Sequence, residues 1–432
     1  MSLKYKTPGY FKKFQCLGGE CPDTCCKEWD IKLDREHYDE LSHLMTVEPA
    51  QKNLFDQYIK IKEQAVTGDH DFAYIKMNEQ GYCPMLETSG LCSLHHEYGI
   101  EPLGNICAFF PRVISRCEHD IEMSGAMSCP EVARLCLQEK NPVKLSPFNL
   151  SDLPRQKNYP IHRELPHLGN DFYAQHFKEV RRTLQNILNE TSFGIDTRLY
   201  TLATFAHQIS DIYHKGCKNP QPMLNTIIDK SIPNMGRLDE YVSNYESHEP
   251  VALIVIHSIL QIKQQRFQTE NLSRIAESVY QDYVDEINQG NKDAEVDAIG
   301  LQNAFHQKAR FFEQAFPDKL DQYLSRYVEN CFFREWFYTM PDVFTFIQML
   351  LLRVAILRFL ILSHPEIVAL VGEQLGHPNS EKQKLLLEKV TYVVYNFARS
   401  IDQNTAFLQV IFNAVSEQEM MNYDYSLAFI KI

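Results

Sequence analysis

Residues 21–26 read CPDTCC, and Cys16 stands five positions before them, so four thiols fall within eleven residues. The spacing is C-x4-C-x3-C-C, with Cys25 and Cys26 adjacent. Disulfide bonds, metal binding and the packing of buried free thiols are three explanations for such crowding. The remainder of the chain indicates which explanation applies. The explanation matters for the fold, because it says what holds the N-terminal part together.

The cysteines are concentrated at one end of the chain. Ten of the twelve lie in the first third of the 432 residues. This part predicts short strands and turns, with β-hairpins at 72–86 and 112–128 and a helix beginning at Pro130. Cys217 and Cys331 stand alone later in the chain, where a free core cysteine is the default interpretation.

The pattern becomes helical after about residue 150. We interpret the Pro-rich polar stretch 146–166 as a linker. In 176–190, apolar residues recur at spacings of three and four, which is typical of a helix with one buried face. Similar patterns predict further helices at 202–216, 385–401 and 404–418.

These patterns together predict a mainly α fold. A small cysteine-rich, metal-binding module with short β-hairpins would occupy residues 1–145. It would be docked on an all-helical domain formed by residues 150–432. Any strands are expected only in the first part.

Charge and hydrophobicity exclude some partners. The formal net charge of −13 is unfavourable for binding nucleic acid, because phosphate contacts need clustered Lys and Arg. The longest apolar stretch, 346–362, is interrupted by Arg353 and Arg358, so we expect a buried core helix and no membrane insertion. The first fourteen residues lack the apolar core of a secretory signal, so we expect a cytoplasmic protein. Thiols stay reduced there, which favours metal binding over disulfides.

The adjacent pair Cys25 and Cys26 indicates what kind of metal centre to expect. Consecutive side chains of an extended segment point in opposite directions, so they reach different metal atoms more easily than one ion. This favours an iron–sulfur cluster, with zinc as the alternative. One cluster plus one zinc, or two similar sites, would be served by eight candidate ligands: Cys16, Cys21, Cys25, Cys26, Cys83, Cys92, Cys107 and Cys129.

Two other side chains of the module are candidates for the site. His95 follows Cys92 with C-x2-H spacing, although a histidine hydrogen-bonded in the module wall fits as well. Arg112 could donate to a sulfide, a thiolate or a substrate carboxylate, and a structural ion pair fits equally. Cys117 and Cys136 have no clear partner in the pattern.

Several common motifs of cofactor binding are absent from the sequence. It has no G-x-G-x-x-G after a strand, no P-loop and no C-x3-C-x2-C. Dinucleotide-binding and P-loop functions therefore have no support. The pattern identifies neither the pocket of a methyl donor nor a general acid or base.

Five segments of the module resemble, in order and spacing, the bacterial flagellin lysine-N-methylase family. The N-terminal part is also similar to zinc- or iron-chelating CxxCxxCC domains. The resemblance continues more loosely in YVENCFFREWF and VYNFARSIDQNTAFL, near the C-terminus. The five segments are FQCLGGECPDTCCKEWDIKLD, IKMNEQGYCPML, GLCSLHHEYG, CAFFPR and SCPEVARL.

The resemblance implies an enzyme that adds methyl groups to the side-chain amine of lysines on flagellin. S-adenosylmethionine is the implied donor, and an iron–sulfur cluster, 4Fe–4S, is the implied cofactor. The eight cysteines named above are the implied ligands. The alternative is a protein without enzymatic activity, in which zinc stabilises a binding module for a flagellar or other protein.

Overall fold

The structure of the chain is a computed structural model. It describes residues 4–27, 29, 31–62, 69–165, 171–245, 250–266, 270–287, 298–372 and 379–432. The chain divides into two compact units, which we name the cysteine unit (Met1–Leu135 with Lys144–Leu165) and the helical unit (Cys136–Val143 with Pro166–Ile432). The predicted domain bounds, 1–145 and 150–432, stay a prediction.

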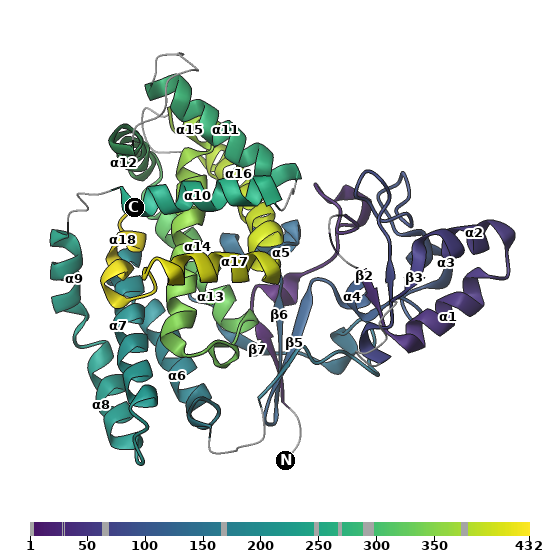
Figure 1. The fold of residues 1–432 in the computed structure, drawn as a ribbon, viewed down its shortest axis with the longest axis horizontal. Coiled ribbons are helices and arrows are strands. Elements are labelled where there is room, and N and C mark those ends of the chain that lie inside the picture. The colour runs from purple at the N-terminus through teal and green to yellow at the C-terminus, as the bar shows by residue number, and fades with distance from the viewer. Residues whose placement is uncertain are drawn as a thin grey trace. The chain divides into compact units, whose positions relative to one another are not determined.

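The mainly α fold class is confirmed. Helices dominate the described residues, and the strands found there are short and all precede residue 165. Figure 1 shows the helices and strands of both units. The described residues form eight strands: β1 (Lys4–Pro8), β2 (Ile31–Leu33), β3 (Ile59–Ile61), β4 (Ala73–Ile75), β5 (Arg112–Cys117), β6 (Asp120–Gly125), β7 (Leu145–Pro147) and β8 (Arg163–Glu164).

Two small sheets organise the cysteine unit. The larger one has the strand order β7-β1-β6-β5-β8 and the smaller one β2-β4-β3. The hairpin predicted at 112–128 is confirmed, because β5 and β6 pair antiparallel with Arg112 opposite Gly125. The helices of this part are α1 (Arg35–Met45), α2 (Pro49–Tyr58), α3 (Ser93–Tyr98), α4 (Asn105–Phe109) and α5 (Pro130–Gln138), of which the last three residues belong to the helical unit.

The hairpin predicted at 72–86 is wrong in its second arm. The turn is present, since the Asn78 side chain accepts a hydrogen bond from the Tyr82 N–H at 2.9 Å. However, both edges of β4 are already paired, with β2 and β3. The chain after the turn therefore leaves the sheet, and the Cys83 N–H donates to the Cys26 carbonyl at 2.7 Å.

The linker interpretation of 146–166 is also wrong for most of its residues. β7 pairs with β1, and β8 pairs in parallel with β5, so both strands belong to the larger sheet. Residues 144–165 are part of the cysteine unit. Proline and polar residues suit such edge strands as well as they suit a linker.

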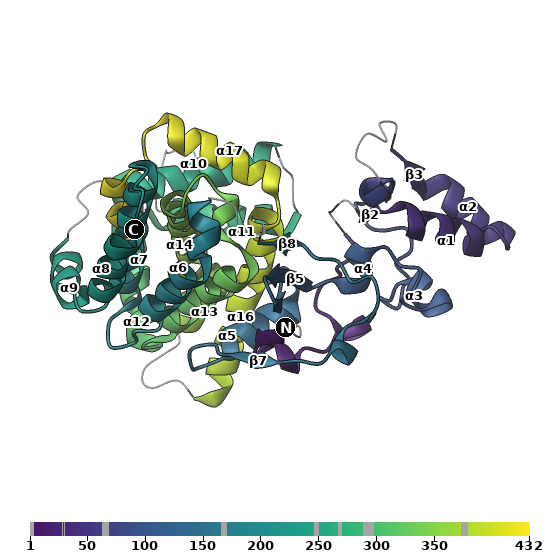
Figure 2. The same ribbon diagram turned by 90° about the horizontal axis from the view of Figure 1, so that it is seen from below.

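The helical unit is built around α14, which packs on α7, α12, α13, α16 and α18. Figure 1 and Figure 2 both show α14 running through the middle of this unit. Its described residues contain no strand. The helices are α6 (Phe172–Leu188), α7 (Ile195–His214), α8 (Gln221–Ser231), α9 (Met235–Asn244), α10 (Val251–Arg266), α11 (Glu270–Ile287), α12 (Ala298–Ala315), α13 (Lys319–Arg334), α14 (Val343–Ser363), α15 (Pro365–Gly372), α16 (Ser380–Phe397), α17 (Thr405–Glu417) and α18 (Ser426–Ile430).

Helix α14 is long and apolar enough to cross a membrane, yet 94% of its most apolar stretch is buried inside the structure. Its two arginines have partners within the helical unit. The Arg358 guanidinium donates to Asp196 at 2.5 Å and to the carbonyl of Ile430. The helix thus has the burial and the paired charges of a core helix, as we expect from its sequence.

Arg353 is the centre of a buried network of charges. Its guanidinium donates to Glu335 at 2.8 Å and to Asp402 at 3.3 Å. The Tyr327 hydroxyl donates to the same oxygen of Asp402 at 2.8 Å. Arg334 forms ion pairs with both carboxylates. Because Arg353 is only 3% exposed, its charge depends on these partners and not on water.

We expect Arg353→Met to destabilise the helical unit strongly. The change leaves the buried carboxylate of Asp402 and the partly buried one of Glu335 with one cation between them. Breaking a buried pair from one side costs about 3–5 kcal/mol. Lys389→Ala is the control, because Lys389 pairs with Glu366 at a more exposed position and such pairs contribute about 1 kcal/mol or less. Urea unfolding curves measure the free energy of unfolding of both variants. Equal losses of this free energy would contradict the role of Arg353 as the centre of the buried network.

Candidate metal centre

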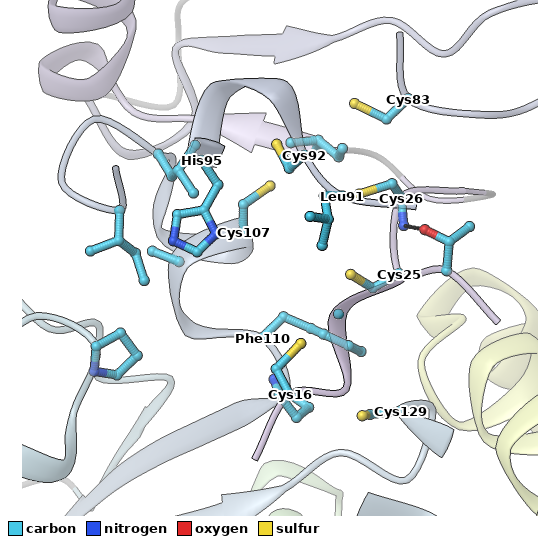
Figure 3. Close-up of a pocket in the computed structure, with 18 of the residues that line it drawn as sticks. Cys16, Cys25, Cys26, Cys83, Leu91, Cys92, His95, Cys107, Phe110 and Cys129 are labelled. Atoms are coloured by element: carbon cyan, nitrogen blue, oxygen red, sulfur yellow. Dashed lines mark hydrogen bonds between the residues drawn. The ribbon is translucent and has the colours of Figure 1, made fainter. Parts of the chain in front are cut away.

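The structure brings all eight predicted ligands to one cavity. This cavity has a volume of about 430 Å³ and lies entirely within the cysteine unit. Figure 3 shows seven of the sulfur-bearing side chains around it. The thiols in its lining are Cys16, Cys21, Cys25, Cys26, Cys83, Cys92, Cys107 and Cys129. Whether they ligate a metal stays a prediction.

Local hydrogen bonds fix the adjacent pair. The Thr24 hydroxyl accepts from the N–H of Cys26 at 3.0 Å, which folds the chain into a tight turn. The indole of Trp29 donates to the Cys25 carbonyl at 2.7 Å. Lys27 and Asp23 form an ion pair at 2.9 Å across the same turn. The turn therefore holds Cys25 and Cys26 in fixed backbone positions at the cavity wall.

Two loops approach each other closely on another side of the cavity. A Cβ atom at Gly19 would lie only 2.5 Å from the Ser89 carbonyl oxygen, so the backbones can meet only because this residue is glycine. One loop carries Cys21, and the other leads to Cys92. Cys92 stands at the N-cap of α3. The contact thus brings together thiols that are about 70 residues apart in sequence.

Cys107 lies on α4, a helix held by a polar network. Arg155 donates to the Asn105 side chain at 2.5 Å and to the Leu103 carbonyl at 3.2 Å. Asn105 in turn donates to Asp34 at 3.2 Å. Burial opposes ionisation of Asp34, but hydrogen bonds from His37 and the nearby Arg155 leave its pKa below the ordinary value. The pattern did not identify this network, because Arg155 lies in the stretch interpreted as a linker.

Backbone N–H groups point at four of the sulfur atoms. The donors are the N–H of Asp23 to Cys21, of Met85 to Cys83, of Leu94 and His95 to Cys92, and of Glu131 and Val132 to Cys129. Such bonds stabilise a thiolate more than a neutral thiol. In metal–thiolate centres, hydrogen bonds of this kind to the sulfur ligands orient the ligands and tune the metal.

Without a metal, burial keeps these thiols neutral. It raises the pKa of Cys83 to about 11 and that of Cys129 to about 12, and nearby cysteines act in the same direction. The pKa of Cys107 is raised well above its ordinary value, first by burial and then by neighbouring thiols. A bound cation would reverse this balance by stabilising the deprotonated sulfur.

The sulfur atoms fall into two groups with Cys25 between them. Cys83, Cys92 and Cys107 influence one another electrostatically, as Cys16 and Cys21 do at the other end. Cys25 acts on members of both groups. Figure 3 shows this division, with Cys16 and Cys129 at one end.

The thiols of the cavity do not form a preformed site for a metal ion among the described residues. In the part of the chain that the structure describes, no three His, Cys, Asp or Glu side chains are grouped so that they could hold a metal ion. A zinc site needs four ligands about 2.0–2.3 Å from one point, whereas a cluster spreads its ligands over several iron atoms. The donor chemistry fits a metal, and the choice of an iron–sulfur cluster over zinc stays a prediction.

The other cysteines lie outside the cavity. Cys117 is buried on β5, and the Cys136 thiol donates to the carbonyl of Arg326 at 3.5 Å. Cys217 and Cys331 belong to the helical unit and are free thiols. His95 and Arg112 do line the cavity. The apolar part of its wall includes Trp29 and Phe110, whose ring centroids are 5.4 Å apart.

The helical unit has a match among known families. Residues 181–429, more than half of the chain, match the model of the FliB lysine N-methylase C-terminal domain. These residues do not include the cysteine cavity, so the similarity of the cysteine unit to CxxCxxCC domains stays a prediction.

Three curated relatives give a similar picture. A protein named lysine-N-methylase from Salmonella choleraesuis (strain SC-B67) is 27% identical over 140 residues, which are 32% of this chain and 34% of the relative. The lysine-N-methylase of Salmonella typhimurium is 26% identical over the same length, with the same coverage. The flagellar biosynthetic protein FliU of Salmonella muenchen is 27% identical over 140 residues, or 79% of its length. The chain thus spans about a third of the length of the first two relatives, and no solved structure matches it.

We expect Cys25→Ser to lose most of the bound metal and to destabilise the cysteine unit, because binding energy at such a site is also folding energy. Cys26→Ser should behave in the same way. Cys217→Ser is the matched control, since this half-buried thiol lies in the helical unit. Metal per chain, measured by elemental analysis after anaerobic purification, decides the question. Full metal retention in both cavity variants would refute the ligand assignment.

We also expect the metal affinity to fall as the pH is lowered. Cys83 and Cys129, with pKa values of about 11 and about 12, are protonated at neutral pH when no metal is bound. Each thiol that becomes a ligand must then release one proton. The logarithm of the affinity therefore rises, for each pH unit, by the number of protons released. Titration calorimetry with ferrous iron in buffers of different ionisation enthalpy measures this number. An affinity that does not change with pH would exclude thiolate ligation.

Proposed function

This chain belongs to the FliB lysine N-methylase family through its helical residues 181–429, and we propose that it transfers methyl groups to the side-chain amine of lysines on flagellin. The names of the two lysine-N-methylase relatives support the reaction. The name of the FliU relative supports a flagellar substrate. S-adenosylmethionine is the methyl donor that we propose.

We propose that the cysteine cavity holds an iron–sulfur cluster of the 4Fe–4S type. The observation that carries this proposal is the convergence of eight thiols from distant parts of the chain on one cavity. A cluster bound there would supply an electron or an open iron site to the donor. The backbone N–H groups at Cys21, Cys83, Cys92 and Cys129 would hold the sulfur ligands in their charged form.

The substrate lysine also has to be activated. The pKa of a free lysine side chain is about 10.4, so the amine is protonated at neutral pH and cannot attack a methyl group. Removing water from the amine favours its neutral form. Apolar side chains of the cavity, among them Phe14, Trp29 and Phe110, offer such surroundings. We therefore propose that this wall lowers the pKa of the incoming lysine.

The proposal includes a cytoplasmic location. None of the twelve cysteines forms a disulfide bond in the structure, and those of the cavity remain available as ligands only if they stay reduced. The negative net charge would attract a lysine-bearing partner, but this is a salt-dependent effect on the rate of encounter and not on the chemical step.

The direct test is mass spectrometry of flagellin co-expressed with this protein. We expect mass increments of one or more methyl groups on lysines with the intact protein and none with the Cys25→Ser variant, which should lack the metal. The Cys217→Ser variant should methylate like the unaltered chain. A colourless protein that binds zinc stoichiometrically and leaves flagellin unmodified would instead support the zinc-stabilised binding module.

A further inference from the structure

Most charged side chains that line the cysteine cavity are already paired. Asp23 has its ion pair with Lys27. Glu131 accepts two hydrogen bonds of 2.7 Å from the guanidinium of Arg134. The carboxylate of Asp152 accepts from the N–H of Asn149 at 2.9 Å. Among the described residues of the lining, Arg112 is the formally charged side chain that remains.

The guanidinium of Arg112 has no carboxylate partner among the residues that the structure describes. It lies over the ring of Phe14, with 5.3 Å from its central carbon to the ring centroid. The nearby ionisable groups that act on it are the thiols of Cys16 and Cys129. Burial lowers the pKa of Arg112 below its ordinary value, although an arginine remains protonated at neutral pH. While these thiols are neutral, the guanidinium has no anion beside it, and a partly buried cation of this kind gains from binding one.

The chemistry of the cavity limits which anion fits. Arginine binds a carboxylate through two parallel hydrogen bonds. A phosphate group carries more charge and usually engages several cations or a cradle of N–H groups, whereas no Lys or second Arg is found among the described lining residues. A single guanidinium beside an apolar wall therefore matches one carboxylate attached to a partly apolar molecule. The volume of about 430 Å³ is ordinary for a small-molecule site.

We propose that Arg112 binds the carboxylate of an amino-acid group in the cysteine cavity. This inference rests on the proposed function, in which that group is the methionine part of the methyl donor. β5 holds the backbone of Arg112, because this residue pairs with Gly125 of β6. Arg112 is thus a binding residue for the donor, and it takes no part in ligating the metal.

The test compares two nucleosides that differ in the amino-acid group. S-adenosylhomocysteine has the carboxylate, and 5′-methylthioadenosine lacks it. For Arg112→Gln, we expect titration calorimetry on the metal-loaded protein to show S-adenosylhomocysteine binding weakened roughly 10- to 100-fold, as for the loss of a charged hydrogen bond. Binding of 5′-methylthioadenosine should not change, and Arg112→Lys should recover part of the loss. Arg116→Gln is the matched control, because Arg116 lies on the same strand in an exposed pair with Glu164.

The outcomes separate this inference from the proposed function. If Arg112→Gln binds S-adenosylhomocysteine as the unaltered protein does, or loses affinity for both nucleosides equally, the inference is wrong and the proposed function stands. Loss of iron in Arg112→Gln would assign this residue to the metal centre and also overturn the inference. If the unaltered, metal-loaded protein binds neither nucleoside, both the proposed donor and the role of Arg112 are refuted.

Discussion

The cysteine unit depends on one constraint: eight sulfur atoms face a cavity where a domain of this size would ordinarily bury methyl and aromatic groups. The segments around the cavity contribute little stability of their own. α3 has six residues and α4 has five, both too short to form stable helices alone. Their positions follow from the groups that surround them, namely the Gly19 contact, the Arg155 network and the sulfur atoms themselves. A cation that binds the thiols would therefore join these segments in the way that a hydrophobic core does in other domains.

In the helical unit, charged side chains are buried in an apolar core. Its central helix, α14, is apolar and buried along almost its whole length, yet it carries Arg353 and Arg358. Asp402 reaches Arg353 from a π-helical segment, Ala398–Asp402, that directly follows α16. A π-helical turn changes the direction in which side chains leave a helix, and here it accompanies a carboxylate that is 2% exposed. The buried ion pair thus joins the end of this segment to α14.

The mainly α class and the choice of the eight thiols that line the cavity could be predicted, because both depend on composition and on short, regular spacing. That all eight line one cavity could not be predicted, since one site and two sites fit the spacing equally. Helical periodicity indicated α6, α7, α16 and α17. The preference for more than one metal atom, which rests on the Cys25–Cys26 pair, stays a prediction. The role of 144–165 could not be predicted in this way, because its strands pair with residues far away in sequence and its prolines are as typical of a linker. The same holds for Arg155 and for the second arm of the 72–86 hairpin. Their structure is determined by tertiary hydrogen bonds that leave no local pattern.

The path of the chain between the two units has a consequence for how the protein can be made. Residues 136–143 belong to the helical unit, where the Val143 N–H donates to Glu329 at 2.8 Å, and residues 144–165 return to the cysteine unit. A ribosome therefore releases a cysteine unit that lacks β7, β8 and Arg155 until residue 165 has emerged. The segment 136–143 can make its contact with Glu329 of α13 only after almost 190 further residues have been synthesised. Neither unit can be separated from the other by a single cut in the chain, and the cysteine unit completes its chain while the helical unit is still unfinished.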